Sequence, residues 1–127
     1  MTDSSRILFV DDDRDSCEMM SLMLNLTDES LEVISAGTAE DALSLMSTQK
    51  FDLFILDYRL PDLTGVELCG RIRHFDSQTP IMFYSAMSGQ IDRETARAAG
   101  ADEYLIKPND LHCLTQKVKQ LLSASER

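Results

Sequence analysis

The sequence predicts an α/β fold built on a parallel sheet, and two observations support this fold class. Five short apolar segments with the composition of strands occur at 6–10, 31–35, 53–56, 81–84 and 104–106. A segment with the apolar spacing of an amphipathic helix follows each of them. Strands that alternate with helices form βα units, which place helices on both faces of a parallel sheet.

The first two βα units occupy the amino-terminal part of the chain. The strand at 6–10 ends in the aspartates 11–13, and a helix is expected over 14–26. The second strand lies at 31–35, and Thr38 is expected to cap the helix that follows. The apolar faces of these two helices are predicted to contain Cys17, Met20 and Leu24, and Ala39, Ala42, Leu43 and Met46, respectively.

The segment 53–56 is a continuous apolar run, the pattern of a strand buried on both faces at the centre of a parallel sheet. Pro61 has no N–H to donate and disfavours a helical conformation at Leu60, so this strand must stop near Asp57. One carboxylate is therefore expected at the carboxyl end of a central strand. In open parallel sheets this edge binds ligands.

A third helix is expected from Thr64, and its inner face is predicted to contain Val66, Cys69, Ile72 and Phe75. The fourth strand follows Pro80 at 81–84 and ends at Ser85. A helix of small residues at 92–99 is closed by Gly100, because glycine commonly ends helices.

The fifth strand lies at 104–106 and ends at Lys107, and a last helix is expected from Asn109. Its inner face is predicted to contain Leu111, Leu114, Val118, Leu121 and Leu122. At 127 residues the chain suits one domain over 1–127, with an ordered core at about 5–122. The polar end at 123–127 is expected to fray or to begin a linker.

Composition excludes several classes of function. The net charge of −10 argues against direct binding to nucleic acid or to an anionic membrane. No apolar segment has the length of a membrane span or the form of a signal peptide, which favours a cytoplasmic location. Cys17, Cys69 and Cys113 are far apart in sequence and are expected to be reduced and buried in helices.

Polar side chains follow four of the predicted strands: Asp11 and Asp12 the first, Asp57 the third, Ser85 the fourth and Lys107 the fifth. In a parallel sheet these strand ends lie at one edge, so the side chains can converge. Three carboxylates in one place repel one another, and a hard divalent cation such as Mg²⁺ relieves that repulsion. The set suits phosphoryl transfer, with Asp57 as an acceptor that forms an acyl phosphate and with Lys107, Ser85 and the metal around the transferred group.

At these residues the chain resembles the receiver domain of bacterial two-component response regulators. The shared pattern covers nearly the whole chain: Val10-Asp11-Asp12, Asp57 followed by Leu60-Pro61 and Gly65, Ser85-Ala86, Asp92, Ala96, Gly100-Ala101, Tyr104-Leu105 and Lys107-Pro108. None of these short motifs alone is specific for the family, but the whole set in this order and at these spacings is. The resemblance implies a flavodoxin-like, doubly wound sheet of five parallel strands in the order 2-1-3-4-5, with five helices.

The resemblance also implies a function. Asp57 would accept a phosphoryl group from the phosphohistidine of a sensor histidine kinase or a histidine phosphotransfer protein. Mg²⁺, or Mn²⁺ in its place, would be held by Asp12, Asp57 and the backbone carbonyl of Arg59, with Asp11 assisting. Lys107 and Ser85 would complete the site. Such a domain is a signalling module rather than an enzyme, although it assists its own phosphorylation and dephosphorylation.

The family pattern further implies a switch. Phosphorylation draws in the hydroxyl of Ser85, and the aromatic side chain of Tyr104 turns inward to fill the space left. The face formed by the fourth helix, the fifth strand and the fifth helix then changes its affinity for an output partner or a fused output domain. Arg59 and Met87 occupy two variable positions that tune the lifetime of the phosphoryl group, and we expect them to make it fairly long.

Three alternatives remain open. A receiver fold that no longer takes phosphate would act as a phosphorylation-independent binding module. Asp11 and Asp13 match the paired aspartates of haloacid dehalogenase phosphatases, although Asp15 stands where that family has Thr or Val. Flavin binding is the weakest alternative, because no loop rich in Ser, Thr and Gly follows the first strand.

Overall fold

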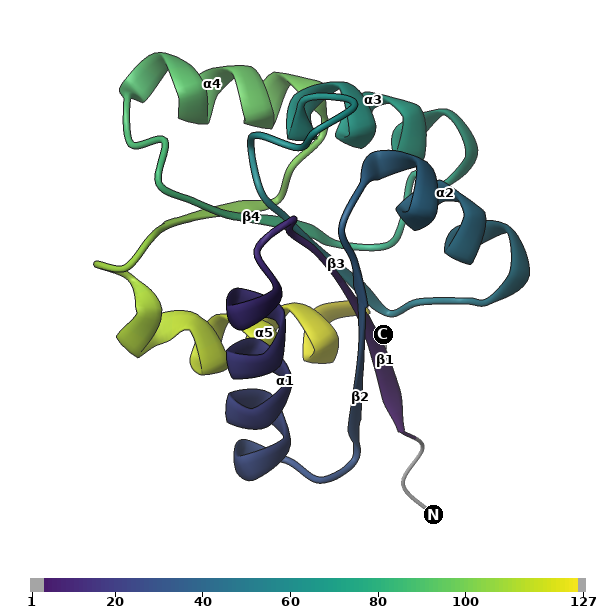
Figure 1. Cartoon of the computed structure of the whole chain (residues 1–127), viewed down its shortest axis with the longest axis vertical. Coiled ribbons are helices and arrows are strands. Elements are labelled where there is room, and N and C mark those ends of the chain that lie inside the picture. The colour runs from purple at the N-terminus through teal and green to yellow at the C-terminus, as the bar shows by residue number, and fades with distance from the viewer. Residues whose placement is uncertain (1–3, 126–127) are drawn as a thin grey trace.

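The computed structural model describes residues 4–125 and contains one five-stranded sheet between two layers of helices (Figure 1). The strands are β1 (Ser5–Val10), β2 (Leu31–Ala36), β3 (Leu53–Leu56), β4 (Ile81–Ser85) and β5 (Glu103–Ile106). They pair in the order β2-β1-β3-β4-β5, and every adjacent pair is parallel. The predicted fold class and strand order are confirmed.

The helices are α1 (Arg14–Thr27), α2 (Ala39–Thr48), α3 (Gly65–Phe75), α4 (Gln90–Ala99) and α5 (Leu111–Ser125). Helices α1 and α5 cover one face of the sheet, and α2, α3 and α4 cover the other (Figure 1). Each face has its own core of buried side chains. Central strand β3 contributes to both cores, and all four of its residues are buried, as its continuous apolar run predicts.

Capping side chains mark where the first three turns between a strand and a helix end. The Asp13 side chain accepts a hydrogen bond from the Asp15 N–H at the start of α1. Thr38 and Thr64 cap α2 and α3, the latter in a full capping box with Glu67. Because these three helices start at their caps, the residues between strand and cap are left at the carboxyl edge of the sheet, where the polar side chains gather.

The structure differs from the sequence prediction in a few details. Phe75 is 60% exposed rather than part of the inner face of α3, because it is the last residue of that helix and the chain turns away directly after it. Helix α5 continues through Ser125, three residues beyond the ordered core expected from the sequence, and residues 126–127 lie outside the described part. Cys17 and Cys113 are half-buried rather than buried.

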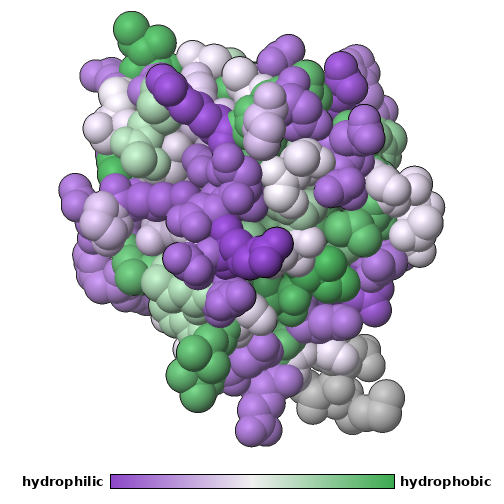
Figure 2. All heavy atoms as spheres, in the orientation of Figure 1, coloured by the Kyte–Doolittle hydropathy of each residue, from purple (hydrophilic) through white to green (hydrophobic). Residues whose placement is uncertain are grey.

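The surface of the domain is mostly polar on the face shown in Figure 2, as expected when the apolar side chains are packed in the two cores. Apolar groups are scattered among the polar side chains of this face. Among residues 4–125, no helix is both long enough and apolar enough to cross a membrane.

Candidate functional site

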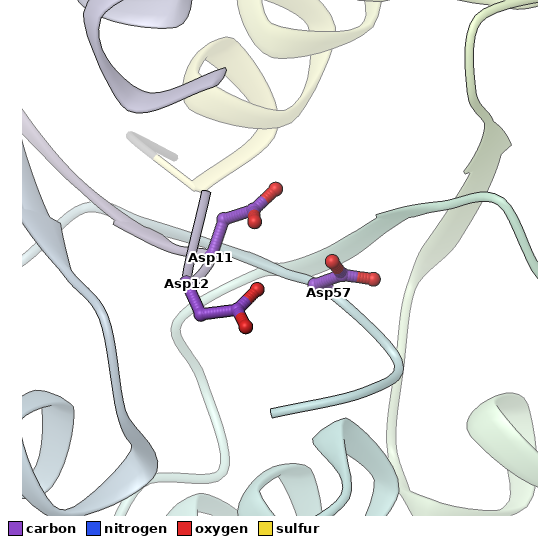
Figure 3. Close-up of side chains that lie close together, drawn as sticks. All are labelled: Asp11, Asp12 and Asp57. Carbon is purple, nitrogen blue, oxygen red and sulfur yellow. The ribbon is translucent and has the colours of Figure 1, made fainter. Parts of the chain in front are cut away.

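Three carboxylates converge at the carboxyl edge of the sheet. Asp11 and Asp12 follow β1, and Asp57 follows β3. Each offers a carboxylate oxygen, and these oxygens lie within 4.8 Å of one another. Figure 3 shows the three side chains grouped at the ends of the two strands. The structure thus brings together the three acids that the sequence singled out.

Backbone hydrogen bonds of the sheet hold this edge in place, because they continue one residue beyond three of the strands. The Asp11 N–H donates to the Ala36 carbonyl at 3.0 Å, and the Asp57 N–H donates to the Val10 carbonyl at 3.0 Å. The Lys107 N–H donates to the carbonyl of Ser85 at 2.9 Å. These bonds fix the backbone of Asp11, Asp57 and Lys107 before any ligand binds.

Lys107 lies between two of the acids. Its Nζ donates to Asp11 Oδ2 at 2.6 Å and to Asp57 Oδ2 at 3.3 Å, and Asp11 is only 2% exposed. Burial has the largest single effect on the pKa of Lys107 and lowers it, but the hydrogen bond to Asp11 and the charges of Asp57 and Asp11 together raise the pKa above its usual value. Lys107 therefore carries its positive charge at neutral pH.

The charge balance of the site favours a divalent cation. Three carboxylates face one ammonium group, so two negative charges stay uncompensated within a few ångströms of each other. All of the available side-chain ligands are hard oxygen donors, which Mg²⁺ prefers. Asp12 is exposed at the mouth of the site, whereas Asp11 is buried behind it. The residues present therefore fit a magnesium site that is open toward solvent.

The remaining predicted residues lie around this cluster. The Tyr58 N–H donates to Asp57 Oδ1 at 2.7 Å and orients the carboxylate. Ser85 is 1% exposed, and its Oγ accepts a hydrogen bond from the Met87 N–H at 3.2 Å. Arg59 is exposed on the loop that follows β3.

Tyr104 already points inward in this structure. It is 8% exposed, its ring stacks on Phe83 at 5.6 Å between centroids, and its hydroxyl donates to the Met87 carbonyl at 2.6 Å. Burial is the main reason that the pKa of Tyr104 is raised to about 12, although a hydrogen bond with Ser85 lowers it in part. Tyr104 thus occupies the inward position in this structure.

Sequence reasoning assigned no role in the site to two residues that shape it. Gly65 packs against the backbone of Asp57 so closely that an added Cβ would lie 2.0 Å from the Asp57 carbonyl oxygen. Asp62 accepts hydrogen bonds from the first two N–H groups of α2. The sequence offered a signal only for Gly65, which is part of the receiver pattern; an aspartate after a proline does not indicate which helix it caps.

The fold and the site together define a doubly wound α/β domain with an acidic centre at the carboxyl edge of its sheet. The sequence model for the response regulator receiver domain matches residues 7–119, and the chain belongs to this family. It is accordingly a receiver domain of the two-component signalling type.

Known proteins of the family are similar to nearly the whole chain. The chain is 37% identical over 123 residues to the transcriptional regulatory protein AfsQ1 of Streptomyces coelicolor, covering 97% of this chain and 53% of that protein. It therefore spans about half the length of the curated relatives that it matches.

Solved structures give the same result. A two-component response regulator from Clostridium difficile superposes with a TM-score of 0.87 at 31% identity, covering 94% of this chain and 97% of that one. The response regulator TrrA of Thermotoga maritima, solved in complex with Mg²⁺-BeF, superposes with a TM-score of 0.80 at 32% identity, covering 92% of this chain and 98% of that one.

Proposed function

We propose that this domain is a phosphoacceptor and that Asp57 receives a phosphoryl group from the phosphohistidine of a sensor histidine kinase or a histidine phosphotransfer protein. The observation that carries the proposal is the position of the Lys107 ammonium group between Asp11 and Asp57, beside a third carboxylate. This arrangement places a nucleophile next to fixed positive charge and next to ligands for a cation.

The step exchanges one bond to phosphorus for another. A carboxylate oxygen of Asp57 attacks the phosphorus, the bond from phosphorus to the histidine nitrogen breaks, and its electron pair returns to the imidazole. The Tyr58 N–H holds the Asp57 carboxylate in one orientation. Lys107 supplies positive charge beside the acceptor, and the Ser85 hydroxyl supplies a donor for a phosphoryl oxygen.

Asp12, Asp57 and the backbone carbonyl of Arg59, with Asp11 assisting, would hold Mg²⁺ or, in its place, Mn²⁺. The cation supplies charge compensation for the phosphoryl oxygens when it is bound. TrrA, solved with Mg²⁺-BeF, supports this assignment through its similarity to the chain. The two uncompensated negative charges of the acidic cluster support it independently.

Acetyl phosphate tests the proposal directly. With acetyl phosphate and Mg²⁺, the intact protein should gain the mass of one phosphoryl group, and Asp57→Asn should not. Asp41→Asn, a change at an exposed aspartate on α2, is the matched control and should be phosphorylated like wild type. Absence of the added mass in wild type would favour the phosphorylation-independent binding module. Turnover of a generic phosphate ester would favour the phosphatase.

We further propose that Ser85 and Tyr104 form the switch. Met87 joins the two residues in this structure, because its N–H donates to Ser85 Oγ and its carbonyl accepts from the Tyr104 hydroxyl. A shift of Ser85 toward a phosphoryl group would therefore act on the loop that holds Tyr104. The face formed by α4, β5 and α5 would then change its affinity for an output partner or a fused output domain.

Two positions flanking the site are proposed to tune the lifetime of the phosphoryl group. Arg59 is exposed on the loop after β3 and would overhang the mouth of the site. The side chain of Met87 has no polar group to orient an attacking water. We also propose that residues 1–127 form a single receiver domain and that it works in the cytoplasm, where a kinase would phosphorylate it.

A further inference from the structure

Asp62 joins two segments that flank the acidic cluster. Its Oδ1 accepts a hydrogen bond from the Ala39 N–H at 2.9 Å, and its Oδ2 accepts one from the Glu40 N–H at 2.9 Å. The bond from Ala39 is the main reason that the pKa of Asp62 is lowered, followed by the bond from Glu40. A charged carboxylate from the loop between β3 and α3 therefore sits on the amino end of α2, where the helix dipole favours negative charge.

These two bonds complete the cap of α2. The first four N–H groups of a helix have no partner within the helix. Asp62 accepts from Ala39 and Glu40, and the Thr38 hydroxyl accepts from Asp41. The Thr38 carbonyl accepts from Ala42, which is the first ordinary hydrogen bond of the helix. Two of these three side-chain caps thus come from a different βα unit, and only Asp62 links the helix to another segment.

The linked segment is the loop that carries Arg59. At its base, the Gly65 N–H donates to the Tyr58 carbonyl at 2.6 Å, and Arg59 forms an antiparallel bridge with Thr64. Leu60 and Leu63 pack partly against the core. Asp62 adds a polar attachment between the loop and α2.

The other side of the link leads to the acidic cluster. Helix α2 follows β2, and the last residue of β2, Ala36, accepts the backbone hydrogen bond of Asp11. Asp62 therefore connects the loop that offers the Arg59 carbonyl to the unit that holds the backbone of Asp11.

We propose that Asp62 is a positioning residue for the metal site, because it fixes the Arg59 loop relative to Asp11 and Asp12. The inference rests on the proposed function, in which these groups hold the cation. Mg²⁺ demands near-ideal octahedral geometry, so its affinity depends on how well each oxygen is placed beforehand. Without the Asp62 bonds, metal binding would have to order the loop and would lose the entropy of that ordering.

The experiment compares Asp62→Asn with Thr38→Ala. Thr38→Ala removes the hydroxyl that accepts from the Asp41 N–H, whereas Asp62→Asn replaces one of the two accepting oxygens with an amide nitrogen that cannot accept. Only Asp62→Asn therefore weakens the attachment of the loop to α2. Titration calorimetry of each full-length variant with MgCl₂ gives the Kd. We expect Asp62→Asn to raise the Kd by about tenfold, the lower end of effects seen for outer-shell partners of metal ligands. We expect Thr38→Ala to leave the Kd unchanged.

Two controls separate positioning from charge. Glu40→Gln removes a negative charge at the same helix end but keeps the backbone N–H that Asp62 binds, so its Kd should stay at the wild-type value. Asp62→Glu keeps the charge and a carboxylate and should recover part of the affinity. In metal-free protein, amide hydrogen exchange at residues 58–64 should be faster in Asp62→Asn than in Thr38→Ala.

Equal Kd values for Asp62→Asn and wild type, or an equal rise in Asp62→Asn and Thr38→Ala, would overturn the positioning role while leaving the proposed function intact. An equal rise in Asp62→Asn and Glu40→Gln would replace positioning by a general charge effect. If wild-type protein showed no Mg²⁺ binding in the same titration, the metal part of the proposed function would fail, and this inference with it.

Discussion

Gly65 starts α3 against the backbone of Asp57, and Gly65→Ala tests how tightly this proposed acceptor residue is held. An added Cβ would lie 2.0 Å from the Asp57 carbonyl oxygen and 3.0 Å from Cε2 of Phe83. Cβ contacts below 3.0 Å essentially do not occur, so the Cβ and this oxygen must separate by about 1 Å. The start of α3 cannot move away freely, because the Gly65 N–H also donates to the Tyr58 carbonyl.

The size of the effect follows from this geometry. Adding a methyl group to a well-packed site costs about 1–3 kcal/mol. We expect the upper end, about 3 kcal/mol, because the clash is with backbone rather than with a flexible side chain. For a domain of this size 1 kcal/mol corresponds to roughly 4 °C in Tm, so the Tm should fall by about 12 °C. Phosphorylation by acetyl phosphate should also slow, since the displaced carbonyl belongs to Asp57, the proposed acceptor.

Gly70→Ala is the matched control on the same helix. A Cβ at Gly70 would have no atom within 4 Å, and alanine is favoured over glycine in a helix interior by about 1 kcal/mol. This variant should therefore gain about 4 °C in Tm and keep the wild-type rate of phosphorylation. Thermal unfolding by circular dichroism and mass spectrometry of the phosphorylated chain measure the two effects. A Gly65→Ala protein as stable and as reactive as wild type would refute the reasoning.

Two further predictions concern the proposed tuning and switch residues. Arg59→Ala combined with Met87→Glu should shorten the lifetime of the phosphoryl group, because it opens the mouth of the site and adds a group that orients water; an unchanged or slower loss of phosphoryl mass would contradict the proposed tuning. The raised pKa of Tyr104, about 12 against a usual value of 10, means that its contribution to stability is fully present below pH 10 and is lost as the pH rises toward 12. Tyr104→Phe should be less stable than wild type at neutral pH by about 1 kcal/mol, because the Met87 carbonyl loses its donor. Between pH 10 and 12, the free energy of unfolding measured with denaturant should change less with pH in this variant than in wild type.

The sequence was sufficient to predict the sheet and its acidic edge, because those features depend on short-range patterns. The apolar run at 53–56 and Pro61 together place Asp57 at a strand end, whatever the rest of the chain does. The same reasoning places Asp11 and Lys107 at strand ends. Parallel pairing then brings the ends to one edge, so convergence follows from topology alone.

Features that depend on contacts between distant segments were not predictable. Nothing in the local sequence of Asp62 indicates that its carboxylate reaches α2, more than twenty residues earlier in the chain. The side of the sheet to which Tyr104 turns depends on the space beside Phe83 and on the Met87 carbonyl, both supplied by other elements. Phe75 fits the periodicity of α3 but, as the last residue of that helix, it is 60% exposed, because periodicity does not show where packing ends.

The groups proposed to surround the metal are held in two different ways, some by the sheet and some by loop contacts. This difference predicts which substitutions should disturb the site. Asp11, Asp57 and Lys107 are fixed by backbone hydrogen bonds of the sheet, so changes in loops that do not contact their backbone, as Gly65 contacts that of Asp57, should move them little. Asp12 and Arg59 lie on exposed segments beyond the strands and depend on loop contacts for their position. A cation with strict octahedral geometry is sensitive to its least constrained ligand. The loop contacts at Gly65 and Asp62, rather than the sheet, should therefore limit how well the site is formed before the proposed cation and phosphoryl group bind.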